Sequence, residues 1–298
     1  MHRRNHLKML AALLSGSLAV CARALAGEPP APDEPSAAPR RIRYAFSAQN
    51  QSARVLEQPS VLVHAPVRQT STQRVEALSC TQPSLVEVDV FGNQTLRVQL
   101  EPLAPYATRV VTIDAQLAVH DAPRSEALPS LLQQSYRVAE RYVEAADPRI
   151  KALVPSLKSD TATHTAKNVF DCVRRTLRAD EYQGRERGAV NALQARAGAC
   201  ADHAYLFTAL MRAAGYPARV VCGYIGGDSA LLRAYDFHTW AEFHDDGAWR
   251  LADAHQGRFM REPARYIAMR IVSSRAPGSL EATQRYRVLE RALEIRMG

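Results

Sequence analysis

The sequence lacks the closely spaced cysteine and histidine ligands that bind zinc. It contains five cysteines and nine histidines in 298 residues, but no Cys-x-x-Cys pair and no His-Glu-x-x-His motif. His203 follows Cys200 closely, yet no further metal ligands accompany them. We therefore expect neither a metal site nor another cofactor.

Long apolar runs and concentrated charge are also lacking. The apolar run of residues 9–20 has about twelve residues, which is too short for a helix that spans a bilayer. The formal net charge is +8, and subtracting the four basic residues of the acid-free segment 1–26 leaves +4 for residues 27–298. This mildly basic composition lacks the basic cluster and the motifs of nucleic-acid-binding proteins. We expect no stable membrane span and no nucleic-acid partner.

Residues 1–26 have the three regions of an export signal peptide. Arg3, Arg4 and Lys8 form the charged region, residues 9–20 the apolar region, and residues 24–26 (Ala-Leu-Ala) a small-residue cleavage site. We expect these residues to be a signal peptide, and the protein to be periplasmic or secreted.

Two details of this segment concern the route of export. The Arg3-Arg4 pair is similar to a twin-arginine signal, although His6 replaces the usual Phe. Cys21 follows residues that resemble a lipoprotein cleavage site, but Val20 is larger than the residue expected there. We therefore rank a lipid anchor second to a soluble form.

The composition changes twice after the signal peptide. Residues 27–40 are rich in Pro, Ala and acidic residues, which is typical of a flexible linker. Residues 41–122 contain segments in which apolar and polar residues alternate, and they predict an antiparallel β-sandwich. The candidate strands are 60–67, 85–90, 95–100 and 109–119. His64 and His120 are expected to be ordinary surface residues of this domain.

Residues 123–298 form the second predicted domain. Apolar residues at helical spacing predict helices over 131–146, 163–178, 201–214 and 279–297, and alternation predicts a strand over 266–273.

Cys200 stands at the start of the predicted helix 201–214, directly after Gly198-Ala199. Unpaired backbone N–H groups and the positive end of the helix dipole favour the thiolate at such a position. The same N–H groups could bind an oxyanion. We predict that Cys200 is a nucleophile.

His238 and Asp253 are predicted to meet in a β-hairpin. Residues 237–244 and 249–253 read as strands, and Asp246-Gly247 between them is typical of a tight turn. A symmetric turn pairs position 244 with 249 and position 240 with 253. Asp253 then shares a face with His238 as its diagonal neighbour. If the register of the hairpin slipped by one residue, His238 and Asp253 would lie on opposite faces.

These segments resemble a known family. Gly-Ala-Cys-Ala-Asp-His at 198–203, His-Thr-Trp-Ala-Glu-Phe at 238–243 and Trp-Arg-Leu-Ala-Asp at 249–253 are similar to the transglutaminase-like cysteine hydrolases, relatives of the papain-type fold. The resemblance covers roughly residues 147–253, with Ala254 where the family often has Pro. It implies an α+β fold, in which a helix bearing the cysteine packs on an antiparallel sheet. It also implies a Cys200-His238-Asp253 triad.

Several other residues are assigned provisional roles. Gln194 has the spacing of the glutamine oxyanion donor of papain-type enzymes, and Tyr182 resembles an aromatic residue found upstream in transglutaminase-like proteins. Trp240 and Asp202 are candidates for lining the substrate cleft. Residues 226–235 are expected to form one wall of that cleft. Arg219 and Glu242 are interpreted as scaffold. Cys80, Cys172 and Cys222 allow at most one disulfide.

The leading hypothesis is an exported cysteine hydrolase that cleaves an amide bond, peptide or isopeptide, through a thioester acyl-enzyme. Its substrate would be a protein, a peptide or a cell-envelope component. Acyl transfer to an amine is the first alternative. A non-catalytic binding or assembly protein that retains the fold is the second. The sequence makes no prediction of the oligomeric state.

Overall fold

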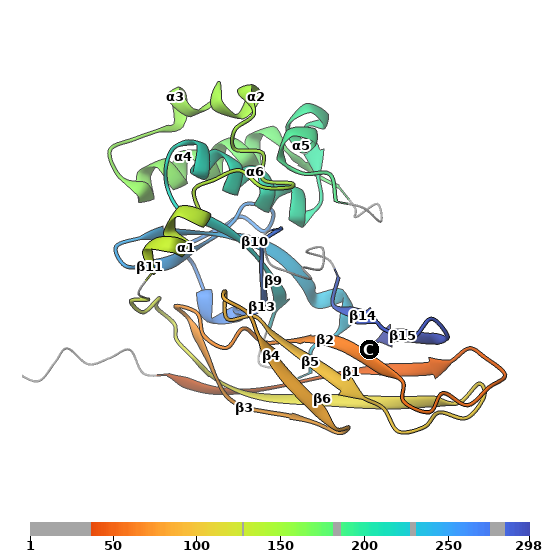
Figure 1. Ribbon diagram of the computed structural model, residues 1–298. Coiled ribbons are helices and arrows are strands. Elements are labelled where there is room, and N and C mark those ends of the chain that lie inside the picture. The colour runs from red at the N-terminus through yellow and green to blue at the C-terminus, as the bar shows by residue number, and fades with distance from the viewer. Residues whose placement is uncertain (1–36, 127, 181–185, 227–230, 275–283) are drawn as a thin grey trace, which may run out of the picture. The chain divides into compact units, whose positions relative to one another are not determined.

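The computed structural model describes residues 37–126, 128–180, 186–226, 231–274 and 284–298. It combines helices with three larger antiparallel sheets (Figure 1). The predicted signal peptide and residues 27–36 of the predicted linker lie outside the described residues. No helix within the described ranges is long and apolar enough to cross a bilayer.

The strands of residues 38–119, together with β14 and β15 near the C-terminus, form two four-stranded sheets with the orders β15-β1-β6-β3 and β14-β2-β5-β4. We call this pair of sheets the sandwich. All four candidate strands predicted here are present, and β1 begins at Ala38, inside the predicted linker. The strands are β1 (Ala38–Asn50), β2 (Ser60–Ala65), β3 (Gln73–Cys80), β4 (Ser84–Val88), β5 (Gln94–Gln99), β6 (Thr108–Val119), β14 (Tyr286–Val288) and β15 (Leu293–Met297).

Alternation along the strands places one apolar face of each sheet in a shared core. In β1, Ile42, Tyr44 and Phe46 are buried, and they pack with Val61 of β2 and Ile113 of β6. Burying each large aliphatic or aromatic side chain stabilises the fold by roughly 1.5–3 kcal/mol. This repeated burial is what makes these residues form a sandwich.

The helix predicted over 279–297 is wrong for its described residues. Residues 286–288 and 293–297 are strands β14 and β15, which pair with β2 and β1. Leu293 and Ile295 are buried in the sandwich core, at the period of two that a strand requires. Pairing with the edges of β1 and β2 therefore decides the secondary structure of these residues, rather than the weak helical spacing of their apolar side chains.

The second half forms a five-stranded sheet with the order β12-β11-β10-β9-β13. Its strands are β9 (Ala218–Ile225), β10 (Phe237–Asp245), β11 (Ala248–Asp253), β12 (Arg258–Phe259) and β13 (Tyr266–Val272). The helices α4 (Ala162–Thr176), α5 (Ala189–Ala195) and α6 (Cys200–Ala213) are grouped together beside this sheet (Figure 1). Their apolar residues form one core with β9 and β10.

Shorter elements connect these layers. They are α1 (Ser130–Ser135), α2 (Pro148–Lys151), α3 (Val154–Leu157), η1 (Ala234–Asp236), η2 (Pro263–Arg265) and the small parallel pair β7 (Arg178–Ala179) and β8 (Ala197–Gly198). The helix predicted over 163–178 is confirmed as α4, whose N-cap Thr161 accepts a hydrogen bond from the His164 N–H.

The helix predicted over 131–146 is largely wrong. Only α1 is helical, because Tyr136 ends it and packs edge-on against Trp249, with 4.9 Å between ring centroids. Farther along, Tyr142 has a positive φ of 69°, which an α-helix excludes.

Side-chain amides of the sandwich bind the backbone of β13. Gln73 accepts from the Ala268 N–H at 2.9 Å and donates to the Ala268 carbonyl at 2.9 Å. Asn93 accepts from the Ile271 N–H at 2.7 Å and donates to the Ile271 carbonyl at 2.9 Å. These contacts cover the free edge of the five-stranded sheet.

Candidate active site

Cys200 is the first residue of α6, as predicted. Ala199 before it is extended, and its N–H donates to the Asp202 carboxylate at 3.1 Å. Gly198 is required by packing, because a Cβ there would come within 2.5 Å of the Asp202 Cβ. The sequence before the helix thus fixes where the helix begins, and with it the position of the thiol.

Helix α6 is more deeply buried than an amphipathic stripe predicts. Residues 201–212 are buried on every side of the helix, including charged Asp202 and Arg212. Asp202 pairs with Arg187 at 3.2 Å, and Arg212 pairs with Glu140 at 2.7 Å. Buried charges need such partners. The central position of α6 holds the Cys200 backbone rigidly.

The hairpin that carries His238 and Asp253 has the predicted register. His244 pairs with Trp249 across the turn, and Asp246 and Gly247 have the positive φ values of a type I′ turn, 49° and 71°. The His238 Nε2 consequently lies 2.7 Å from the Asp253 Oδ2. Both side chains are buried.

Cys200 and His238 form a strongly coupled pair. Burial alone would raise the pKa of the Cys200 thiol, but hydrogen bonding and charge from His238, with hydrogen bonds from Thr239, hold that pKa below its usual value. Burial opposes protonation of His238, but Asp253 and Cys200 raise its pKa to about 9. The geometry therefore favours a thiolate–imidazolium ion pair over a neutral thiol and imidazole.

The Asp253 carboxylate accepts hydrogen bonds through both oxygens. The Oδ2 accepts from the Tyr266 hydroxyl at 2.8 Å as well as from His238, and the Oδ1 accepts from the Gln256 N–H at 3.0 Å. Burial raises the pKa of Asp253, but the bonds from His238, Gln256 and Tyr266 outweigh burial and keep the pKa below its ordinary value. Asp253 is therefore ionised and fixed in orientation.

Sequence reasoning missed Tyr266 and Thr239. Thr239 follows His238 directly, so its position beside Cys200 could have been inferred from the hairpin. Tyr266 is distant along the chain, and no local motif marks it. Only the arrangement of the strands brings it to the site.

The structure places the other candidate residues as follows. Tyr182 lies outside the described residues, as do residues 227–230 of the predicted cleft wall. Gln194 is exposed on α5, in a surface hollow that Arg187 also lines. Trp240 is buried, with its ring against Tyr266 and its Nε1 donating to Glu242 at 3.2 Å. Asp202 is buried in the ion pair described above.

Arg219 and Glu242 form a buried ion pair behind the histidine strand. The Arg219 Nε donates to the Glu242 carboxylate at 2.8 Å, and the guanidinium stacks over the Trp249 ring, 4.0 Å from its centroid. These contacts join β9, β10 and β11 and stabilise the hairpin.

Other histidines surround the site or lie far from it. The His203 Nδ1 is 3.0 Å from the Ala199 carbonyl oxygen, and the His203 ring packs against His255, which in turn lies beside His238. The expectation that His64 and His120 are surface residues is wrong. Their exposed fractions are 8% and 5%.

The described cysteines are all free thiols, so no pair among Cys80, Cys172 and Cys222 is bridged. Burial raises the pKa of Cys222 to about 12. Cys222 is therefore an unreactive core residue, in contrast to Cys200.

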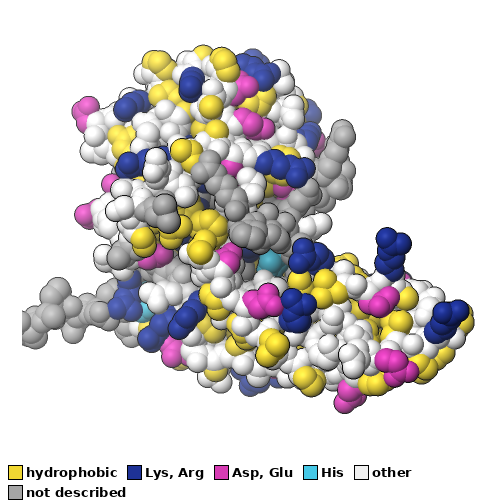
Figure 2. Space-filling model, viewed as in Figure 1, with side chains coloured by type: hydrophobic (Ala, Val, Ile, Leu, Met, Phe, Trp, Pro, Cys, Tyr) yellow, Lys and Arg dark blue, Asp and Glu magenta, His cyan; other side chains and the backbone are white. Residues whose placement is uncertain are grey.

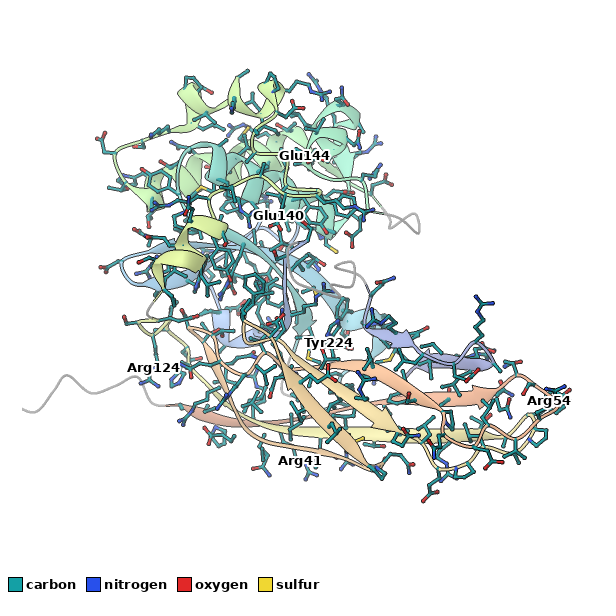
Figure 3. All side chains as sticks on the ribbon, in the orientation of Figure 1. Arg41, Arg54, Arg124, Glu140, Glu144 and Tyr224 are labelled. Carbon is teal, nitrogen blue, oxygen red and sulfur yellow. The ribbon has the colours of Figure 1, made fainter. Side chains whose placement is uncertain are left out.

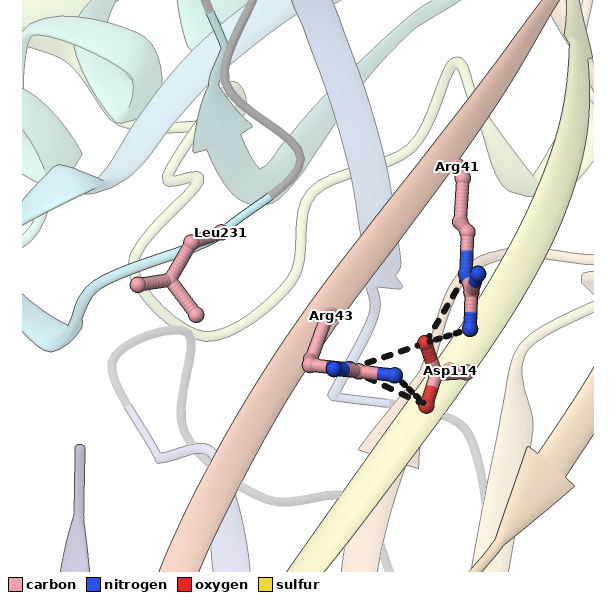
Figure 4. Close-up of a pocket in the computed structure, with 4 residues that line it drawn as sticks. All are labelled: Arg41, Arg43, Asp114 and Leu231. Carbon is pink, nitrogen blue, oxygen red and sulfur yellow. Dashed lines mark hydrogen bonds and ion pairs between the residues drawn. The ribbon is translucent and has the colours of Figure 1, made fainter.

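The described surface also has features outside this site. Figure 2 shows basic, acidic and apolar side chains interspersed on the visible face. A hollow of about 300 Å³ is lined by Arg41, Arg43, Asp114 and Leu231 (Figure 4). Both arginines pair with Asp114 there, which offsets much of their charge.

Within the described part of the chain, no three His, Cys, Asp or Glu side chains are placed to bind a metal ion.

Cys200, His238 and Asp253 all lie within one segment that matches a known family. Residues 151–254 match the model of the transglutaminase-like superfamily, and this segment contains all three residues. The chain therefore carries a domain of that superfamily.

Individual relatives extend this comparison. A protein-glutamine gamma-glutamyltransferase of Pseudomonas aeruginosa is 29% identical over 152 residues, which are 47% of this chain and 20% of the relative. The chain thus spans about a fifth of that relative's length.

Two solved structures are also similar. A proposed cysteine protease from Cytophaga hutchinsonii has a TM-score of 0.60 and 15% identity, over 88% of this chain and 91% of that one. The two proteins share a fold. The periplasmic domain of TgpA from Pseudomonas aeruginosa has a TM-score of 0.41 and 16% identity, over 74% of this chain and 88% of that one.

Proposed function

We propose that this protein is a cysteine-dependent hydrolase that cleaves an amide bond, peptide or isopeptide. The observation that carries the proposal is the continuous chain of contacts from the Cys200 thiol to His238 and on to Asp253, at 2.7 Å between the last two. A thiol at a helix start, beside an imidazole whose far nitrogen is fixed by a carboxylate, is suited to nucleophilic acyl transfer.

In the proposed reaction, the Cys200 thiolate adds to the substrate carbonyl carbon and forms a tetrahedral intermediate. The backbone N–H groups at the start of α6 are candidate donors to the oxyanion, and Tyr182 and Gln194 are kept as candidates for a second donor. Protonated His238 gives its proton to the leaving amine as the carbon–nitrogen bond breaks. Water, deprotonated by neutral His238, then hydrolyses the thioester.

Selective alkylation tests this proposal without knowledge of the substrate. Native protein is treated with iodoacetamide at pH 7, and the modified peptides are quantified by mass spectrometry. Cys200 should react at least about 10-fold faster than Cys80 or Cys172, because thiolate fraction controls the rate. Equally slow labelling of all three would contradict the proposal and favour a non-catalytic binding protein. Activity should then be sought in extracts, with Cys200→Ala as the inactive control.

Acyl transfer to an amine is the second candidate function. It is favoured by the 29% identity to a protein-glutamine gamma-glutamyltransferase over 152 residues. The same thioester would be attacked by an amine in place of water. Incubation with an acyl donor and a labelled amine separates the two reactions. Incorporation of label that exceeds the release of free acid would show transfer.

We also propose that the mature protein is periplasmic or secreted, because residues 1–26 have the composition of a signal peptide. Cell fractionation, together with N-terminal sequencing of the mature protein, tests this. A mature N-terminus at residue 27 is the expected result. An intact N-terminus in the cytoplasmic fraction would contradict export.

A further inference from the structure

Tyr266 reaches the triad from the far edge of the five-stranded sheet. It begins β13, and β9 and β10 separate that strand from β11, which carries Asp253. In a flat sheet, β13 and β11 would lie about 14 Å apart, since neighbouring strands are about 4.8 Å apart. The Tyr266 hydroxyl nevertheless lies 2.8 Å from the Asp253 Oδ2. The sheet must therefore curl so that this side chain crosses over one face.

Neighbouring side chains determine the direction of Tyr266. Along β13, Ile267 faces the sandwich core, whereas Tyr266 and Ala268 face the cluster that contains Trp240. The Tyr266 and Trp240 rings meet edge to face, with centroids 5.1 Å apart. The ring is thus wedged beside the histidine strand, and only the hydroxyl projects to Asp253.

Close contact between β9 and β13 requires a glycine. A Cβ on Gly223 would lie 1.9 Å from the Ile267 carbonyl oxygen, so any side chain there would push β13 away from β9. Gly223 pairs with His238 on its other side. The bare backbone at this position therefore brings the Tyr266 strand close to the histidine strand.

The sandwich fixes β13 from the opposite edge. The Gln73 and Asn93 amides each make two hydrogen bonds to its backbone, at Ala268 and Ile271. These side chains are buried, and amide pairs of this kind lock the strand in register.

We propose that Tyr266 is a positioning residue of the active site, which aims the Asp253 carboxylate at His238 by donating to the oxygen that His238 also uses. The sandwich acts through β13 to hold the hydroxyl in place. This inference rests on the proposed function, since it concerns the same triad. It assigns to the sandwich a part in ordering the catalytic groups.

Several charged groups surround this contact. Burial and then Asp253 oppose ionisation of the Tyr266 hydroxyl and raise its pKa, while Arg258 on β12 and Arg265 in η2 act in the opposite direction. His203 from α6 and His255, after β11, are close to the His238 side. Because burial lowers the pKa of both histidines, each stays neutral near pH 7. Tyr266 consequently remains a neutral donor over the working range.

Tyr266→Phe removes the hydroxyl and keeps the ring against Trp240. Asp253 then loses one of the two donors that fix the position of Oδ2. The carboxylate is less well aimed at His238, so it stabilises the imidazolium and, through it, the Cys200 thiolate less well. The rate of Cys200 alkylation by iodoacetamide should rise at a higher pH than in the wild type. At pH 7, alkylation should be slower by roughly 3- to 30-fold. On a substrate, kcat should fall by a similar factor with KM within about twofold.

Tyr44→Phe is the matched control. The Tyr44 hydroxyl is also buried and donates to the His64 carbonyl at 2.9 Å, but it lies in the sandwich core. Its loss should lower the melting temperature without moving the Cys200 profile. A folded Tyr266→Phe protein with an unchanged profile would overturn the positioning role while leaving the proposed function intact. A wild-type Cys200 with the ordinary pKa of a free thiol would overturn both.

Discussion

Replacing Asp253 by asparagine probes the origin of the thiolate most directly. Asp253 accepts through both oxygens, from His238 and Tyr266 on Oδ2 and from Gln256 on Oδ1. An asparagine side chain offers only one oxygen. Whichever way the amide turns, its NH2 group faces an N–H or O–H donor. The substitution thus removes a charge and leaves buried donors unpaired.

The magnitude follows from the pKa of His238. Its rise from 6.5 to about 9 corresponds to roughly 3 kcal/mol of preference for the imidazolium, at about 1.4 kcal/mol per pKa unit. Asp253 and Cys200 share this effect. Losing the Asp253 share should therefore raise the apparent pKa of Cys200 by about one unit and slow its alkylation at pH 7 by about 10-fold. Turnover should fall further, by roughly 10²- to 10⁴-fold, because the amide also favours the wrong histidine tautomer.

The assay is the iodoacetamide rate of the Cys200 peptide between pH 4 and 10, measured for wild type and variant. Glu140→Gln serves as the control. It also removes a buried carboxylate charge, but one that pairs with Arg212 away from the triad (Glu140 is labelled in Figure 3). It should cost stability and leave the profile in place. A folded Asp253→Asn protein with the wild-type profile and turnover within twofold would refute the reasoning.

Two further predictions concern pH and packing. Because the pKa of His238 is raised to about 9, the imidazolium that protonates the leaving group persists below that pH, and kcat/KM should fall as pH rises through about 9. A descending limb near 6.5 would contradict the ion pair. Gly223→Ala should destabilise the protein by roughly 3 kcal/mol or more in urea unfolding, since its Cβ meets the Ile267 carbonyl oxygen at 1.9 Å. Gly215→Ala is the control, because Gly215 has a positive φ of 94° but open space around it, and it should lower the free energy of unfolding by only about 1 kcal/mol. Equal losses for the two variants would argue against the close contact between Gly223 and Ile267.

Local signals in the sequence were sufficient for the hairpin and for the start of α6. The Asp246-Gly247 turn fixes the register within a few residues, and that register alone brings His238 to Asp253. The position of Cys200 likewise depends on the residues just before it. Such features are local, so pattern and turn chemistry determine them.

Features set by tertiary contacts were missed. Residues 293–297 form a strand because β1 offers them an edge, which the spacing of apolar residues over 279–297 does not show. His64 is buried on β2, which contacts β13 of the five-stranded sheet, so a lone polar residue was mistaken for a surface one. Tyr266 meets Asp253 only through the curl of a sheet whose edge is bound by Gln73 and Asn93. Propensity and periodicity carry no information about such distant pairs.

The pairing of β15 with β1 has a consequence for how the chain folds during its synthesis. β1 is synthesised before the five-stranded sheet and its helices, yet its partner on one side is Leu293–Met297, which is synthesised after them. Until then the edge of β1 is open, and the first sheet lacks one strand. Removing residues 293–298 should therefore leave a permanently unpaired edge on an otherwise complete sheet, and such edges are where proteins associate incorrectly. The five-stranded sheet and the helices beside it must therefore be synthesised before the first sheet can close.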